Sequence, residues 1–297
     1  MIEIGTSTHA IAGFGSPSKP FRQAIAEIAD CGFSHVLLLT SEDGPPVNRT
    51  GFASKVLVDI TRSDVEAILR TVSSYGLRVS CIYPGFVLDF SREGVGATIE
   101  KLMHYRDIAW RLGCHVMIIP AGKAKKPHMP HKDKRGDIKR VAEVMDALSS
   151  DTPGEFFKVA VDIHYGGIIE TVADGEHLLQ CTDNRNSGLC LNIGHMTTLK
   201  EDGWIILTRF PERIHVIAWK DHLVGDNLPS PVFSCELGKG NTPFRKYVEA
   251  YREVECTALN LITFEDVPFE EKRGALKKSY QYLTDLFRES FCGHRSI

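Results

Sequence analysis

Short apolar runs alternate with amphipathic segments along almost the whole chain, and this alternation limits the folds that the chain can adopt. Each run is rich in Val, Ile and Leu, as strands of a parallel sheet must be when both faces are buried. The segments between them carry apolar residues at helical spacing. The predicted strands begin near Ile2, His35, Leu77, Cys114, Lys158, Leu189, Arg213 and Leu259, and the predicted helices cover 20–31, 63–75, 96–112, 136–149, 241–254 and 268–290.

Several of the predicted helices have recognisable ends. Ser63 and Glu66 match a capping box at the start of the 63–75 segment. A glycine ends the helix in each of three similar segments, ADCGFSHVLLL, SSYGLRVSCIY and WRLGCHVMIIP. Glycine suits the left-handed residue that closes a helix, so these segments form a weak internal repeat of strand–helix units.

Eight strands joined by helical crossovers predict an α/β fold, a single (β/α)8 TIM barrel. The barrel would take up residues 1–297 as one domain, with 288–297 as a loose C-terminal tail. The unit after Leu189 is the weakest, because little sequence separates it from the next strand. An open doubly wound sheet is the alternative fold, but it usually carries a Gly-rich turn after its first strand. Here Thr6-Ser7-Thr8-His9 follows instead.

Composition excludes several other classes of protein. The chain is 43% hydrophobic and 25% charged, close to an average globular domain, so disorder, collagen and coiled coil are excluded. The 35 basic and 38 acidic side chains give a formal net charge of −3, which provides no basic face for nucleic acid. No apolar run approaches the ~20 residues that span a bilayer. The first residues also lack the pattern of a secretory signal.

The cysteines form no CxxC pair and are spread through the chain. A chain of this length has an apolar core of its own and does not need disulfides for stability. We therefore interpret the cysteines as reduced, mostly packed thiols in a cytoplasmic protein. They are Cys31, Cys81, Cys114, Cys181, Cys190, Cys235, Cys256 and Cys292.

Polar residues at the carboxyl ends of the predicted strands are the candidate site, because barrel enzymes work at those ends. Ionisable groups are costly to bury unpaired, so their gathering there favours a functional site. Side chains alternate along a strand, so His215 should point away from the face of Lys220 and pack against the helices. The candidates are His9, Lys123, Asp162, His164, Asn192, His195, Lys220, Asp221, His222, Glu265 and Asp266.

A basic segment follows the fourth predicted strand. Residues 123–135 include six Lys or Arg residues and two His residues. Such a segment could form a lid that grips a phosphate or carboxylate substrate. A solvated loop is the more common structure for a run of this kind.

Four strand-end motifs resemble those of the xylose-isomerase-like sugar phosphate isomerase/epimerase superfamily. That family has Glu-Asn-His on strand 5, Asp-x-Gly-His on strand 6, His-x-Lys-Asp on strand 7 and Glu on strand 8. The resemblance extends from Ile2 to about Phe287, and Gly238-Lys239-Gly240-Asn241 is similar to the family's Gly-x-Gly turn. The corresponding motifs here are Asp162-Ile163-His164, Asn192-Ile193-Gly194-His195, Ala218-Trp219-Lys220-Asp221 and Glu265.

The resemblance implies a divalent metal (Mn, Mg, Zn or Co) that polarises substrate oxygens while carboxylates move a proton beside a carbonyl. The matching metal positions are Asp162, Asn192 and Glu265. Asn192 replaces the family's Asp and Ala218 replaces its His, so the site has one anion and one imidazole fewer. A metal-bound and a metal-free site therefore both stay open.

The resemblance also implies roles for the other candidates. Asp162 and Glu265 are the predicted proton-transfer residues, with Lys220 and His195 acting beside them. Lys220 could neutralise the acids in place of a metal or polarise a substrate oxygen. A Schiff base at Lys220 is less favoured, since nothing in the sequence indicates that the pKa of its amine is lowered. The predicted substrate-binding residues are His164, Asn192, Asp221, His222, Lys123 and His9.

The predicted activity is therefore that of a sugar isomerase or epimerase. The substrate would be a small polyhydroxylated ketose, keto-inositol or keto-acid, with neither nucleic acid nor a membrane as partner. Whether the chain forms a homo-oligomer stays open. A lyase or dehydratase acting on a similar keto-sugar is one alternative. A catalytically degenerate barrel that binds a sugar or a protein is the other, and hydrolysis of an abasic site in DNA is less favoured.

Overall fold

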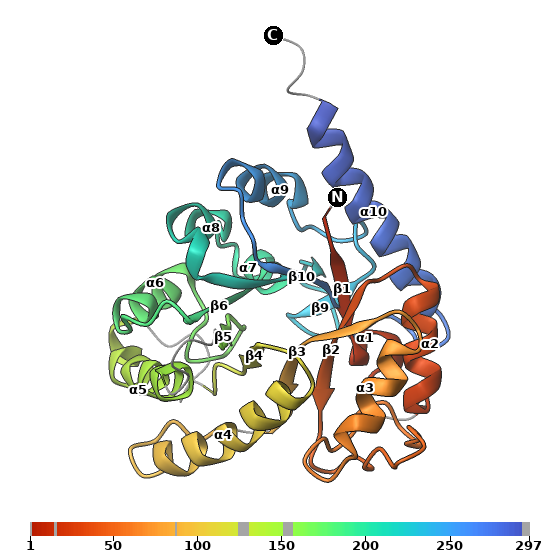
Figure 1. Cartoon of the computed structure of the whole chain (residues 1–297). Helices are drawn as coiled ribbons and strands as arrows, with labels where there is room; N and C mark the ends of the chain where they lie inside the picture. The colour runs from red at the N-terminus through yellow and green to blue at the C-terminus, as the bar shows by residue number, and fades with distance from the viewer. Residues whose placement is uncertain (1, 15–16, 87, 124–130, 151–156, 293–297) are drawn as a thin grey trace.

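Eight parallel strands close into one barrel, and this confirms the predicted (β/α)8 fold (Figure 1). The computed structural model describes residues 2–14, 17–86, 88–123, 131–150 and 157–292. The strands follow one another around the barrel in the order β1-β10-β7-β6-β5-β4-β3-β2. They are β1 (Ile4–Ser7), β2 (His35–Thr40), β3 (Arg78–Pro84), β4 (Val116–Ile119), β5 (Lys158–Asp162), β6 (Ser187–Asn192), β7 (Ile214–Trp219) and β10 (Leu259–Ile262).

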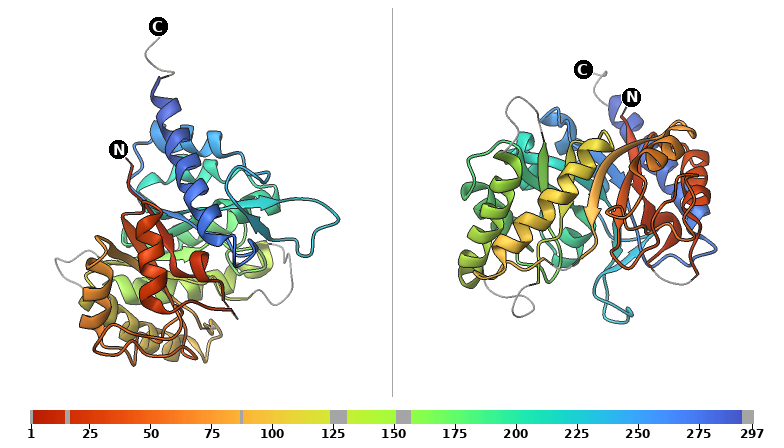
Figure 2. Two further views of the ribbon diagram at one scale, coloured as in Figure 1. Left: turned by 90° about the vertical axis from the view of Figure 1, so that its right-hand side faces the viewer. Right: turned by 60° about the horizontal axis from the view of Figure 1, so that its bottom comes forward.

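Helices surround the barrel as an outer layer, which two further views make plain (Figure 2). No helix in the described ranges is long and apolar enough to cross a membrane. The predicted helices are found as α2 (Phe21–Asp30), α3 (Val65–Ser73), α4 (Val95–Arg111), α5 (His131–Ser150), α9 (Phe244–Glu253) and α10 (Lys272–Cys292).

Two helix ends differ from the prediction. The N-cap of α3 is Asp64, whose side chain accepts a hydrogen bond from the amide of Ala67 at 2.9 Å. Ser63 instead donates its hydroxyl to the carbonyl of Asp59. At the other end of the chain, α10 continues to Cys292, past position 288 where the loose tail was expected to begin. Residues 293–297 lie outside the described residues.

The sequence did not predict the remaining elements. Helix α6 (Val172–Gln180) begins with a capping box between Thr171 and Asp174. Short helices α7 (Ile193–Leu199) and α8 (Trp204–Arg209) with the turn η1 (Pro211–Arg213) form the weak sixth unit, and α1 (Thr8–Ala12) follows β1 directly. An antiparallel hairpin of β8 (Asp221–Leu223) and β9 (Phe233–Cys235) projects from the barrel after β7 (Figure 2).

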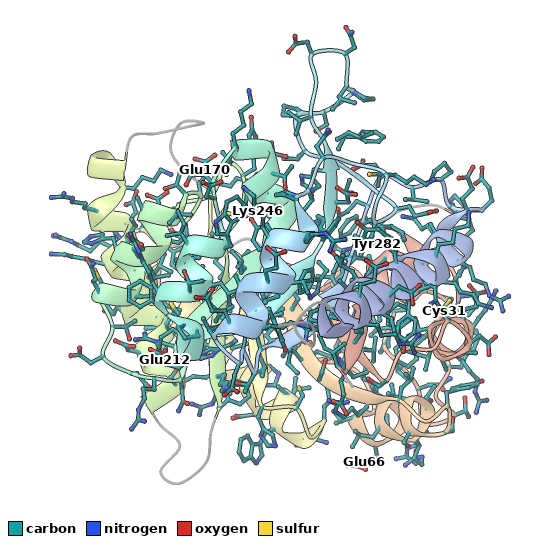
Figure 3. All side chains as sticks on the ribbon, turned by 90° about the horizontal axis from the view of Figure 1, so that it is seen from above. Cys31, Glu66, Glu170, Glu212, Lys246 and Tyr282 are labelled. Carbon is teal, nitrogen blue, oxygen red and sulfur yellow. The ribbon has the colours of Figure 1, made fainter. Side chains whose placement is uncertain are left out.

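The core has two parts that follow from side-chain alternation. Inside the barrel, side chains such as Leu37, Ile118 and Leu261 form one apolar cluster, and a larger cluster fills the space between strands and helices. Val216 belongs to the inner cluster, so its neighbour His215 faces the helix layer, as predicted. Charged side chains such as that of Glu212 are exposed on the outside (Figure 3). The cysteines of the described side chains are free thiols, namely Cys31, Cys81, Cys114, Cys181, Cys190, Cys235 and Cys256.

Candidate active site

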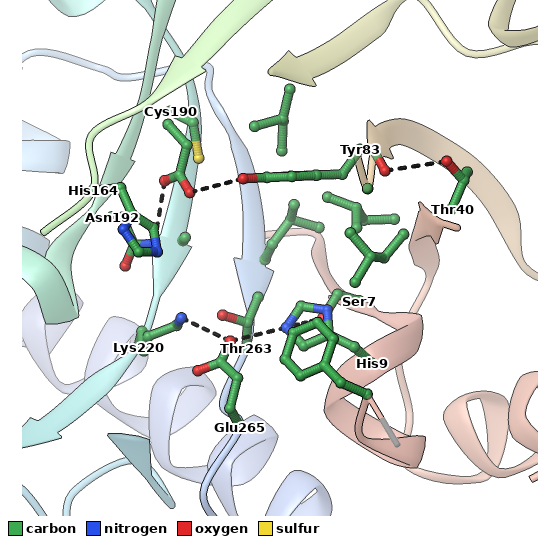
Figure 4. Close-up of a pocket in the computed structure, with 18 of the residues that line it drawn as sticks. Ser7, His9, Thr40, Tyr83, His164, Cys190, Asn192, Lys220, Thr263 and Glu265 are labelled. Carbon is green, nitrogen blue, oxygen red and sulfur yellow. Dashed lines mark hydrogen bonds and ion pairs between the residues drawn. The ribbon is translucent and has the colours of Figure 1, made fainter. Parts of the chain in front are cut away.

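A cavity of about 350 Å³ opens at the carboxyl ends of the barrel strands (Figure 4). Its size lies near the lower end of the 300–1,000 Å³ that small-molecule sites usually have. The structure brings several predicted site residues to this cavity, and Ala218 lines it as well. These residues are His9, Asp162, His164, Asn192, Lys220 and Glu265.

Glu265 is the centre of a compact ionic group beyond the end of β10. The ammonium of Lys220 lies 2.8 Å from its Oε1, and Nε2 of His9 lies 3.0 Å from the same oxygen. An ionised carboxylate only accepts hydrogen bonds, so His9 donates from Nε2. Ser234 on β9 lies with its hydroxyl 2.9 Å from the other oxygen, and Lys272 donates to the backbone carbonyl of Glu265.

The charges around Glu265 decide its ionisation. Burial alone would raise the pKa of Glu265, but the Lys220 ammonium and the His9 hydrogen bond outweigh burial and hold that pKa well below its usual range. Burial lowers the pKa of His9, and the nearby carboxylate offsets only part of that effect. At neutral pH the group is therefore a carboxylate paired with an ammonium and hydrogen-bonded to a neutral imidazole.

Asp162 lies at the end of β5 in different surroundings. Its Oδ1 accepts a hydrogen bond from the Asn192 side-chain amide at 3.2 Å, and its Oδ2 accepts one from the Tyr83 hydroxyl at 3.4 Å. Only 5% of the residue is exposed. Burial raises the pKa of Asp162, although His164 and Lys220 act in the opposite direction. The two carboxyl groups at this cavity thus have pKa values displaced in opposite directions.

Three histidines lie next to one another beyond the ends of β5, β6 and β7. The rings of His164 and His195 are 3.9 Å apart between centroids, and those of His195 and His222 are 5.0 Å apart. Only His164 lines the cavity. Neither ring nitrogen of His195 has a hydrogen-bond partner among the described residues, and burial holds its pKa well below the usual range. His222 accepts or donates a hydrogen bond with the hydroxyl of Thr198 at 2.8 Å.

The positions of His195, Asp221 and His222 do not support the predicted direct contact with substrate. Asp221 is 1% exposed, and its carboxylate accepts hydrogen bonds from the backbone amides of Gly238, Gly240 and Thr242 at 2.8–3.0 Å. It therefore holds the Gly-x-Gly turn in place. His195 and His222 do not line the cavity, and His195 contacts the ring of His164, which does.

Lys123 and the basic segment also lie apart from the cavity. Lys123 is exposed and borders a separate hollow beside Asp89 and Arg140. The proposed lid falls mainly on residues 124–130, which lie outside the described residues. Lys134 belongs to the same segment, but it is buried in α5 rather than in a solvated loop.

Lys134 forms a buried ion-pair cluster with Glu170 and Asp174, here called the Lys134 cluster. The ammonium lies 3.2 Å from the carboxylate of Glu170 and 2.8 Å from that of Asp174, and no side chain in the cluster is more than 2% exposed. Glu170 also accepts a hydrogen bond from the amide of Gly166 at 2.8 Å. The cluster therefore ties α5 and α6 to the loop that follows His164.

Two site residues were not found from the sequence. Tyr83 reaches across the cavity from β3 to Asp162 (Figure 4). Ser234 binds Glu265 from the β8–β9 hairpin, which lies 31 positions earlier in the sequence. A single Tyr inside an apolar strand and a single Ser in an unpredicted hairpin carry no local sequence signal. Both residues can be assigned to the site only from the folded structure.

The residues at the implied metal positions do not fit a divalent cation. Ala218 offers no ligand atom. Asn192 donates its amide NH2 to Asp162 and keeps one neutral oxygen, Oδ1, without a partner among the described residues. Oε1 of Glu265 is bound to the positively charged Lys220, which would repel a second cation at that oxygen. Within the described part of the chain, no group of three or more His, Cys, Asp and Glu side chains is arranged to hold a metal ion. The ammonium of Lys220 provides a positive charge beside Glu265, at the end of the site where the family resemblance implies a metal.

The sequence matches the model of one protein family. The model of the xylose isomerase-like TIM barrel family matches residues 25–286, so the chain belongs to that family, as its strand-end motifs predicted. No curated protein matches this chain by sequence.

Solved structures of the same fold share little sequence with this chain. One is a D-tagatose 3-epimerase-like protein, which is 12% identical with a TM-score of 0.73 over 98% of this chain and 100% of that chain. A 3-keto-D-glucoside 4-epimerase from E. coli is 15% identical, with a TM-score of 0.70 over 96% and 100%. The IolI protein with a bound zinc atom is 10% identical, with a TM-score of 0.71 over 97% and 99%. At these identities the likeness shows the fold alone.

Proposed function

We propose that this protein is an isomerase that moves a proton at the carbon beside a carbonyl group of a small hydroxylated substrate. A ketose, a keto-inositol or a keto-acid would suit the cavity. One observation carries the proposal: Asp162 and Glu265 face the same cavity with pKa values displaced in opposite directions, and the charge of Lys220 acts on both. Such a separation of pKa values is typical of sites that transfer protons.

Asp162 is the proposed base. A carboxylate with a raised pKa binds a proton more strongly, so it is better suited to take one from carbon than an ordinary aspartate. When Asp162 takes the proton, the C–H electron pair forms a carbon–carbon double bond and the carbonyl π electrons move to oxygen. The product of this step is an enediolate when the carbon that loses the proton bears a hydroxyl group, and an enolate when it does not. Lys220 stabilises the new negative charge with a hydrogen bond from its ammonium.

Glu265 has a positioning role in this proposal rather than the proton-transfer role implied by the family resemblance. Its low pKa makes it a weak base, and its Oε1 already accepts hydrogen bonds from Lys220 and His9. With one base, Asp162 returns the proton to the neighbouring carbon, and a hydroxyl proton passes between the two oxygens. That sequence interconverts a ketose and an aldose. Epimerisation would need a second proton donor on the opposite face.

Two other functions share parts of this geometry. A lyase or dehydratase would begin with the same proton abstraction and then expel a β-hydroxyl group. A degenerate barrel that only binds its ligand is favoured by Ala218 and Asn192, whereas the ionic group at Glu265 supports catalysis. The names of the epimerases with the same fold support a sugar substrate. The free thiols support a cytoplasmic location, and a homo-oligomer through the exposed helices stays a prediction.

Solvent deuterium exchange tests the proposal. The protein is incubated in deuterated water with ketotetroses, ketopentoses, ketohexoses, inososes and α-keto acids, and deuterium beside the carbonyl is measured by NMR. We expect exchange into at least one compound, and a loss of about 100-fold or more in Asp162→Asn. The matched control is Asp107→Asn, whose side chain is 72% exposed. Absence of exchange from every compound with folded protein would refute the proposal.

A further inference from the structure

The lining of the active-site cavity is divided into a polar half and an apolar half. The polar half comes from β5, β6, β7, β10 and the α1 turn, and it holds the ionisable residues already described. The opposite half comes from β2, β3, β4 and the segment after β2. Figure 4 shows Tyr83 on that side, with carbon-only side chains around it. The apolar half holds Leu37, Leu39, Leu57, Ile118 and the ring of Tyr83, and Thr40, Ser41 and Gly85 lie on the same side.

The polar side chains of the apolar half are those of Tyr83, Thr40 and Ser41. The hydroxyl of Tyr83 donates to Asp162 at 3.4 Å, and that of Thr40 donates to the backbone carbonyl of Tyr83 at 3.5 Å. The leucine and isoleucine side chains have no polar atoms. A substrate hydroxyl placed against them would leave water without gaining a hydrogen-bond partner, which weakens binding.

Phe14 gives an independent indication at the rim of the cavity. Its side chain is 58% exposed, and its ring stacks on that of His9 with centroids 4.8 Å apart. His9 in turn contacts Glu265. An exposed aromatic ring beside the ionic group offers apolar surface that a ligand would cover on binding.

We propose that the substrate is amphipathic, with an α-hydroxycarbonyl end and an apolar end. This inference rests on the proposed function, which places the hydroxycarbonyl end between Lys220 and Asp162. The other end is an alkyl chain or ring without hydroxyl groups, and it packs against Leu37, Leu39 and Ile118. A fully hydroxylated sugar fits less well, because its distal hydroxyls would face the apolar half.

Three open-chain ketones with the same reactive end test the inference. L-Erythrulose and 1-hydroxy-2-butanone have the same four carbons, but the second lacks both distal hydroxyls, and 1-hydroxy-2-hexanone adds two methylene groups. Deuterium exchange is measured at carbon 1 and divided by the uncatalysed rate at that carbon. We expect kcat/KM to rise from erythrulose to hydroxybutanone, and about tenfold more to hydroxyhexanone, since each buried methylene contributes about 0.8 kcal/mol.

A substitution in the apolar half provides the matched test. Leu57→Asn keeps a similar shape at a half-buried position and adds an amide to the lining. We expect it to lower the preference for hydroxyhexanone over erythrulose at least fivefold. Leu199→Asn, half-buried at the end of α7 and outside the lining, should leave that preference unchanged.

The outcomes separate this inference from the proposed function. If exchange is faster with erythrulose than with the two hydroxyketones, the substrate has no apolar end and this inference is wrong, whereas the proposed proton transfer is supported. If no ketone exchanges, the proposed function fails, and the rise in melting temperature with each ketone decides the inference. A larger rise with hydroxyhexanone than with erythrulose then supports an apolar-ended ligand, and an equal or smaller rise overturns it.

Discussion

Replacing Glu265 with Gln removes one charge from the active site and keeps the shape of the side chain. The glutamine oxygen can still accept from Lys220 and His9, while its NH2 group can donate to the Ser234 hydroxyl. The loss is therefore mainly that of the ion pair with Lys220, whose side chain is 7% exposed against 26% for Glu265. Breaking a fully buried pair costs about 3–5 kcal/mol, so a partly exposed one should cost about 2 kcal/mol.

A loss of about 2 kcal/mol in the free energy of unfolding would lower the melting temperature by about 4 °C in a domain of this length. The effect should depend on pH. Because the folded protein holds the pKa of Glu265 well below its usual value of 4.5, the carboxylate stabilises the fold above pH 4.5, and this contribution is lost as the pH falls through the lowered pKa. The difference from wild type should thus be constant near pH 7 and shrink in acid.

Urea unfolding at a series of pH values measures this difference. Glu249→Gln on the exposed side of α9 is the matched control and should stay within about 0.5 kcal/mol of wild type. If Glu265→Gln is as stable as wild type at pH 7, or if the difference grows in acid, the ion pair does not stabilise the fold as the structure indicates.

Three more substitutions test other parts of the structure. Lys134→Met leaves the two carboxylates of the Lys134 cluster without their cation and should cost about 3–5 kcal/mol in urea unfolding, whereas Lys139→Met on the exposed side of α5 should cost under about 0.5. Burial lowers the pKa of His215 to about 3, so below pH 6.5 the unfolded chain binds one more proton than the folded protein. The free energy of unfolding therefore falls by about 1.4 kcal/mol for each unit by which the pH is lowered. His215→Leu should make the free energy of unfolding less dependent on pH in this range. An unchanged pH dependence would contradict the lowered pKa of His215. Tyr83→Phe removes the hydrogen bond to Asp162, so we expect kcat/KM to fall about threefold. The acid limb of the pH profile of kcat/KM should move to higher pH, because the carboxylate loses a donor. A shift of that limb to lower pH would be inconsistent with the hydrogen bond.

The sequence was sufficient to predict the barrel and the parts of the site that lie on regular strands. Each strand is a run of buried apolar residues, and such runs are recognisable without knowledge of their neighbours. Asp162, Lys220 and Glu265 follow directly from the ends of these runs, so their place at one cavity is a consequence of barrel geometry.

The structure places some predicted site residues away from the cavity lining where the chain leaves the strand early. β6 ends at Asn192 and α7 begins at Ile193, so strand alternation no longer applies to His195, which lies in the helix and outside the lining. Similarly, Asp221 begins the β8–β9 hairpin, where its carboxylate binds backbone amides. Contacts between distant segments, such as that of Tyr83 with Asp162, depend on closure of the whole barrel and leave no local pattern.

In the proposed mechanism, the ammonium of Lys220 supplies the positive charge that stabilises the enediolate. The most direct test is the rate of deuterium exchange into the best substrate, measured for wild type and Lys220→Met after exhaustive chelation and again after addition of Mn²⁺. We predict that chelation leaves the wild-type rate unchanged and that Lys220→Met loses about 100-fold or more, with no recovery in Mn²⁺. A wild-type rate that falls on chelation and returns with Mn²⁺, or a Lys220→Met protein that retains its rate, would contradict the claim.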